Sequence, residues 1–155
     1  MRRKLIGKKV FKGTVDITDP CYDKDVWCRT NAVVKEGTYD CMIWKHTEKF
    51  EYEGKIHKDT RVGIIGIYLN GIIPRQRSME EIGAIGVDAG LAGFFMDKPD
   101  YTEDQWQDIC DMVYKGDAWI TDDGFFSSSG WGDGSYGVYA HKENGEIVAL
   151  EIRFM

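Results

Sequence analysis

The sequence contains no apolar run long enough to cross a membrane. Its first residues, Met1–Lys9, are basic but lack the apolar stretch that follows the charged start of a signal peptide. These two absences predict a cytoplasmic protein with no membrane partner. Because the cytoplasm is a reducing compartment, we expect the four cysteines to be mostly reduced: Cys21, Cys28, Cys41 and Cys110.

Several catalytic and metal-binding motifs are also missing. The chain has no G-x-x-x-x-G-K-[ST] sequence, which excludes a P-loop NTPase, and Ser127-Ser128-Ser129-Gly130 is not the G-x-S-x-G turn of a serine hydrolase. No C-x2-C pair supports a zinc site built from Cys21, Cys28 and Cys41 with His57. Cys21 would be a nucleophile only if a histidine lowered its pKa, so a structural, partly buried thiol is the better interpretation.

Basic residues are scarce in the second half of the chain. Between Met79 and Gly134 the only ones are Lys98 and Lys115, although the segment is rich in aspartate and glutamate and the whole chain has a net charge of −6. An acidic segment disfavours a phosphate-backbone partner on its own face, so the sequence argues against nucleic acid. A cation, a basic partner or simple solubility remain open. The remaining partner classes are a small polar molecule and another protein.

Length and composition predict one domain over residues 1–155. Short apolar or alternating segments separated by turn residues predict strands at 8–15, 31–35, 38–44, 49–56, 61–69, 118–121, 136–141 and 147–154. A helix is predicted over 102–115, because Thr102 and Gln105 form a capping box and an apolar stripe follows. The sequence therefore predicts an α+β fold of mainly antiparallel sheet, a sandwich or half-barrel, with one amphipathic helix packed on a face.

Three loops combine glycine with short polar residues. Asp19 precedes Pro20, a favoured turn start, and Asp88 lies at a predicted strand end before Ala89 and Gly90. The third loop, Ser127–Tyr136, adds Trp131 and Tyr136 as flat stacking surfaces. Each loop is also compatible with an ordinary turn, and for Asp133 we weigh a turn and a site evenly.

The leading interpretation is a non-enzymatic binding domain for a small polar ligand that is nucleotide-like or sugar-like. The cofactor is unknown, and a divalent cation is an option because aspartates supply the oxygen ligands that calcium and magnesium prefer. If the three loops converge, the predicted ligand-binding residues are Asp19, Asp88, Ser127, Ser128, Ser129, Trp131, Asp133 and Tyr136.

Two other function classes stay open. One is a metal-assisted hydrolase or transferase that uses Asp88 and Asp133 as general base and metal ligand, which requires the two carboxylates to meet. The other is a protein-interaction module, for example a phage-encoded inhibitor, which an exposed aromatic patch or a self-association interface would favour.

Four segments together resemble a known family: Asp19–Tyr22, Gly86–Phe95, Ser127–Tyr136 and Gly145–Phe154. The chain resembles an uncharacterised bacterial and phage family, close to domain-of-unknown-function family 4241. Members carry a DPCY-like motif early, a VDxGxAGfF-like motif centrally and an SSSGxGDGSY motif near the end. The resemblance covers most of the chain in order, with Lys45–Arg77 as the looser part. It implies a shared fold and leaves room for a role in phage–host conflict, but it implies no activity.

Overall fold

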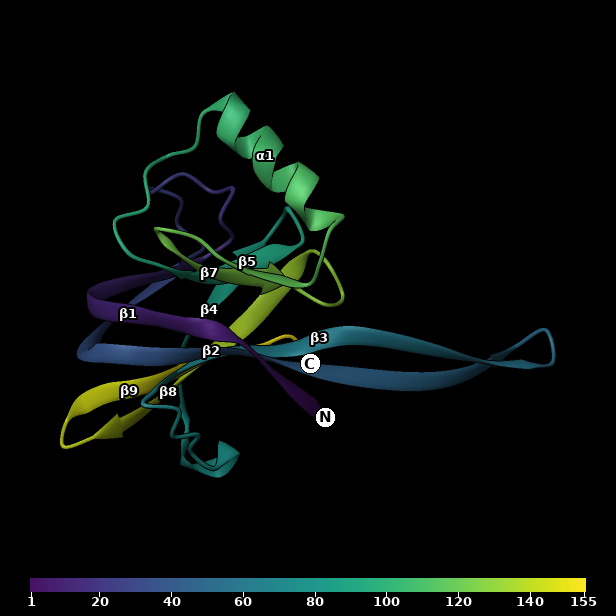
Figure 1. Ribbon diagram of the computed structural model, residues 1–155, viewed down its shortest axis with the longest axis horizontal. Helices are drawn as coiled ribbons and strands as arrows, with labels where there is room; N and C mark the ends of the chain where they lie inside the picture. Colours follow the sequence, from purple (N-terminus) through teal and green to yellow (C-terminus); the bar gives the residue numbers. More distant parts are fainter.

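Nine strands form one sheet in the order β4-β8-β9-β3-β2-β1-β5-β7-β6 in the computed structural model, which describes residues 1–155 (Figure 1). All pairings are antiparallel except a parallel contact between Val34 and Ile147. This confirms the predicted mainly antiparallel α+β fold. The strands are β1 (Arg2–Thr18), β2 (Thr30–Tyr52), β3 (Lys55–Leu69), β4 (Glu80–Val87), β5 (Leu91–Phe95), β6 (Ala118–Ile120), β7 (Gly124–Ser128), β8 (Gly134–Glu143) and β9 (Glu146–Arg153).

The sheet curls on itself, because β9 pairs with β3 and also reaches β2 at Val34. The interior is filled by the largest apolar cluster, to which most strands contribute alternate side chains. Its fully buried members include Phe11, Tyr39, Ile65 and Phe94. A short 3₁₀ helix, η1 (Gln76–Ser78), lies in the connection from β3 to β4. No helix of the chain has the length and apolarity needed to cross a membrane.

The single α-helix, α1 (Glu103–Val113), starts with the predicted capping box. The Gln105 N–H donates to Thr102 Oγ1 at 3.3 Å, and the Thr102 N–H donates to Gln105 Oε1 at 3.0 Å. Ile109 packs against a cluster from β5 and β7, so the helix covers that end of the sheet (Figure 1). The predicted stripe is less buried than expected, because Trp106 remains exposed.

The strand predictions differ from the structure mainly in length. Segments 31–35, 38–44 and 49–52 belong to one long strand, β2, whose pairing with β1 shifts in register between Val34 and Gly37 without a turn, while residues 55–56 belong to β3. The turn falls at Glu53 and Gly54 instead, where both residues have positive φ (51° and 74°) as a two-residue hairpin turn requires. Glu143-Asn144-Gly145 in the sequence predicts a hairpin turn between the last two strands, and this is confirmed, since Asn144 and Gly145 connect β8 and β9.

The hairpin of β2 and β3 extends far beyond the rest of the sheet (Figure 1). Pairing of β1 with β2 stops at Lys45, and pairing of β9 with β3 stops at Ile64. Past these points β2 and β3 pair only with each other, up to Tyr52 and Lys55. We call this ribbon, residues 45–62, the arm. At about 3.3 Å per residue it extends roughly 25 Å, and both of its edges are free.

Candidate functional site

The three loops singled out in the sequence come together in the structure. Asp19 Oδ2 accepts hydrogen bonds from the backbone N–H groups of Asp88 (3.0 Å) and Ala89 (2.7 Å), which joins the first loop to the second. The second meets the third because the Ser129 N–H donates to the Gly90 carbonyl at 2.9 Å. The loops therefore converge, as a site built from them requires.

Most polar groups of these loops bind the chain itself. Asp19 is fully buried, and its Oδ1 accepts a further hydrogen bond from the Cys21 N–H at 2.9 Å. Burial raises the pKa of Asp19 above its ordinary value, and the three backbone N–H groups act in the opposite direction. The hydroxyls of Ser129 and Tyr136 both donate to the Gly132 carbonyl, at 2.6 and 2.8 Å. Buried Ser127 donates to the carbonyl of Ser128, so these groups hold the loops in shape.

Asp88 directly follows β4 and Asp133 directly precedes β8, so the two residues flank one end of this pair of adjacent strands. Val87 pairs with Gly134, and the two aspartates are the next residues beyond that pair. Both are exposed, and neither side chain makes a hydrogen bond or ion pair within the chain. No group of three or more His, Cys, Asp or Glu side chains is arranged to hold a metal ion. The two residues therefore flank the same strand pair, but no third protein ligand joins them to hold a cation.

The cysteines are free thiols. Burial, with a smaller contribution from the Asp19 charge, raises the pKa of Cys21 to about 12. Burial likewise raises the pKa of Cys41 to about 12. A thiol with so high a pKa is protonated at neutral pH and is a poor nucleophile. This agrees with the structural role predicted for Cys21.

Exposed apolar side chains gather on the arm. We call the side of the ribbon that carries His46, Phe50, Tyr52, His57 and Arg61 the aromatic face; these residues alternate along the two strands and share one side. The Phe50 and His57 rings stack with centroids 5.4 Å apart, and Tyr52 meets His57 edge-on at 6.1 Å. The exposed fractions are 51% for Phe50 and 61% for Tyr52, with 76% for Ile56 on the other face.

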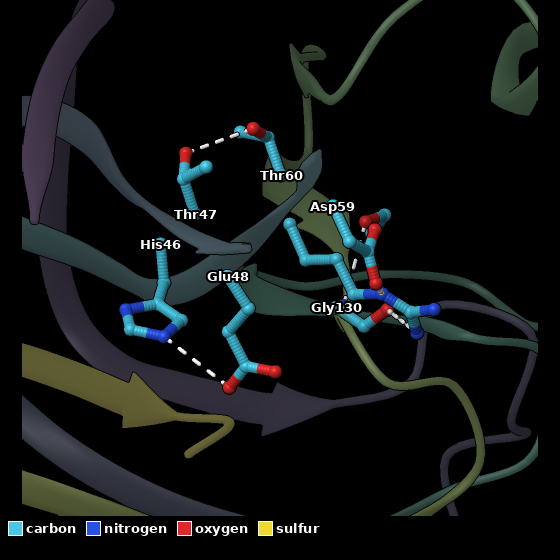
Figure 2. Close-up of polar contacts among 8 residues, drawn as sticks. His46, Thr47, Glu48, Asp59, Thr60 and Gly130 are labelled. Carbon is cyan, nitrogen blue, oxygen red and sulfur yellow. Dashed lines mark hydrogen bonds and ion pairs between the residues drawn. The ribbon is translucent and has the colours of Figure 1, made fainter. Parts of the chain in front are cut away.

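Trp131 joins the base of this aromatic face. Its ring lies 6.2 Å from the His46 ring and 5.8 Å from the Arg61 guanidinium carbon. Arg61 also donates from Nη1 to the Gly130 carbonyl at 3.2 Å and from Nε to Asp59 Oδ2 at 2.8 Å (Figure 2). The loop Ser129–Gly132 therefore contacts the base of the arm through both its backbone and its indole.

The loop Ser129–Gly132 requires glycine at position 130 for a steric reason. The φ of Gly130 is +71°, and a Cβ there would lie 2.2 Å from the Val62 carbonyl oxygen at the base of the arm. Only a residue without a side chain allows the loop backbone to approach β3 so closely. The loop that looked like a ligand loop in the sequence thus supports the arm.

The sequence analysis did not predict a buried polar network that lies beside the connection from β3 to β4. The Trp44 Nε1–H donates to Tyr68 Oη at 3.0 Å, Tyr68 donates to Glu151 Oε2 at 2.6 Å, and the Arg153 Nε–H donates to Glu151 Oε1 at 3.1 Å. Burial and the Glu151 charge raise the pKa of Tyr68 well above its ordinary value. Gly66 makes room for the Tyr68 ring, since a Cβ there would lie 2.3 Å from the Tyr68 oxygen. The signal was available: an acid within the apolar run Ile147–Ile152 marks a buried carboxylate.

A cavity of about 340 Å³ opens beside this network. Glu151 is almost fully buried and contributes the only charged side chain. Such a combination of apolar walls with a few polar groups is typical of small-molecule sites. The lining residues are Met1, Trp44, Ile64, Ile73, Pro74, Gln76 and Glu151.

Comparisons of the chain with family models, curated proteins and solved structures gave no match. The resemblance noted above stays a prediction.

Proposed function

We propose that the chain is a non-enzymatic protein-interaction module that holds its partner with the arm. The observation that carries this proposal is the exposed aromatic ribbon, in which the His57 ring stacks on Phe50 and meets Tyr52 edge-on while Phe50 and Tyr52 stay largely in solvent. Contiguous exposed apolar side chains mark interaction surfaces, and aromatic residues are enriched at the centres of interfaces. The four free cysteines accord with a cytoplasmic location, which belongs to the same proposal.

The free edges of the arm support the same function. A two-stranded ribbon is marginally stable in water when nothing covers it. Unpaired N–H and C=O groups along an edge can also add a strand from another chain. The arm is nevertheless fixed at its base by Arg61, Gly130 and Trp131, which limits the entropy lost when a partner binds.

Photo-crosslinking tests this proposal. A photoreactive phenylalanine analogue replaces Phe50 in one variant and Tyr114 in the control, a residue at the end of α1 that is 90% exposed. Illumination in an extract of the source cells should give adducts of discrete mass from position 50 and not from position 114. If the partner is a second copy of the chain, the adduct has twice the mass of the chain, which identifies it. Equal adduct patterns from both positions would show that the arm has no special affinity for protein.

A small polar ligand is the second candidate function, and the cavity beside Glu151 is the observation that favours it. A thermal-shift screen with nucleotides, sugars, amines and divalent cations tests it. Loss of a ligand-induced shift in Glu151→Gln would place the ligand in the cavity. Loss in Asp88→Ala or Asp133→Ala would place it at the predicted loop site instead. A wild-type protein that no compound shifts would remove the second candidate.

A further inference from the structure

A groove lined only by cationic and hydroxyl side chains lies at the base of the arm. Its volume is about 450 Å³. Pairing of Arg2 with Lys45 places the start of β1 beside the arm, where Figure 1 shows the N-terminus. We call this cavity the basic groove; its lining residues are Arg2, Arg3, Lys4, Lys45, Thr47 and Thr60.

The positive charge of the basic groove is poorly compensated within the chain. Lys45 pairs with Asp117, but Arg2, Arg3 and Lys4 make no ion pair. Bringing four cations together costs free energy because like charges repel. The chain as a whole has a net charge of −6, so the basic groove is a local excess of positive charge. An anionic ligand would stabilise this arrangement.

The cations continue along the arm on the side opposite the aromatic face. Lys45, Thr47 and Lys49 alternate along β2 and share this side with Thr60 and Lys58 of β3, and Glu51 follows on the same side near the tip. Lys49 lies directly across from Lys58, a like-charge pair that destabilises a ribbon. In Figure 2 the Thr47 and Thr60 side chains point to one side, joined by a 2.8 Å hydrogen bond, and His46 and Glu48 point to the other.

We infer that the basic groove and the adjoining Lys49–Lys58 pair bind a nucleic-acid strand through its phosphates. Arginine and lysine are the usual phosphate ligands, and threonine hydroxyls add hydrogen bonds to phosphate oxygens. From Lys45 in the groove to Lys49 on the arm the cations extend over about 13 Å, which suits an extended chain of phosphates better than one compact anion. The acidic composition of Met79–Gly134 disfavours phosphates on the surface of that segment only, so it does not conflict with this site.

Fluorescence anisotropy with a labelled 20-nucleotide oligothymidylate tests the inference. If the strand neutralises about four cations, its affinity should fall roughly 50-fold between 50 and 200 mM salt. The double variant Lys49→Gln/Lys58→Gln should weaken binding at low salt and reduce that fall to about sevenfold. The control, Lys115→Gln/Lys142→Gln, changes the net charge equally at exposed positions outside the groove and should bind as the wild type does.

Three results would overturn the inference. The wild type does not bind the oligonucleotide at 50 mM salt; the control variant loses as much affinity as the arm variant; or inorganic tripolyphosphate binds while the oligonucleotide does not. All four substituted lysines are exposed, so thermal melting should show neither variant less stable than the wild type. The test is independent of the proposed function, since Phe50 and Tyr52 are unchanged in every variant.

Discussion

Replacing Gly130 by alanine should loosen the arm from the body of the protein. The new Cβ would lie 2.2 Å from the Val62 carbonyl oxygen, and a backbone atom in a strand cannot easily move away. The loop would have to shift, which separates Gly130 and Trp131 from Arg61. Gly132 provides the matched control: its φ is also positive, at +94°, but a Cβ there meets nothing within 4 Å.

The two substitutions should differ in magnitude. Alanine in the left-handed region costs about 1–2 kcal/mol, partly offset by about 0.4–1 kcal/mol because the unfolded chain also loses freedom. Gly132→Ala should therefore destabilise the protein by about 1 kcal/mol. Gly130→Ala adds the steric clash and the lost contacts of Arg61, about 1–2 kcal/mol more. Its total of about 2–3 kcal/mol corresponds to a decrease in melting temperature of roughly 5–10 °C for a chain of this length.

Urea denaturation gives the free energies of unfolding, and hydrogen exchange shows where the effect lies. Amides of residues 45–62 should exchange faster in Gly130→Ala than in Gly132→Ala. If the two variants are equally stable and the arm amides exchange alike, the loop does not support the arm, and its glycines need another explanation.

Three further predictions concern buried groups. Burial raises the pKa of Asp19 above its unfolded value of 3.8, so its stabilising contribution is complete below pH 3.8 and is lost as the pH rises through the folded-state pKa. Urea melts from about pH 3.5 to pH 7 should therefore show the stability of the wild type falling relative to that of Asp19→Asn. Parallel stability curves for the two proteins would contradict this. At pH 8, Cys21 and Cys41 should react with iodoacetamide about a thousandfold more slowly than thiols of pKa 9, as peptide mass mapping can test. Tyr68→Phe should cost about 2–4 kcal/mol by leaving the Trp44 N–H and a Glu151 oxygen unpaired, whereas Tyr52→Phe on the arm should leave the urea midpoint unchanged.

Local patterns in the sequence predicted local structure well. The capping box of Thr102 and Gln105 is present because both partners lie within one helical turn. The Asn144-Gly145 turn formed because these residues tolerate positive φ. The strand end predicted at Gly37 is wrong, because β2 continues through this residue with only a local shift in its pairing to β1.

The candidate site was predicted only in part. The loops of Asp19, Asp88 and Ser127–Tyr136 do converge, but the structure gives Asp19 three backbone partners and gives the serine loop a supporting role. The arm lay in the segment that the resemblance left loosest, and its alternating residues resemble those of an ordinary half-buried strand. Whether Phe50 and Tyr52 are covered depends on neighbouring strands, which no local pattern specifies.

By itself, the sequence determined the features that depend on residues near one another in the chain: antiparallel strands, one capped helix and the turns. Only the tertiary structure decided which surfaces are left uncovered. β1 begins beside Lys45 and β9 ends beside Ile64. The hairpin beyond these two residues therefore has no neighbouring strand, and its aromatic side chains stay in solvent. The same arrangement brings Arg2, Arg3 and Lys4 to Lys45, a convergence of cations from residues about forty positions apart in the chain.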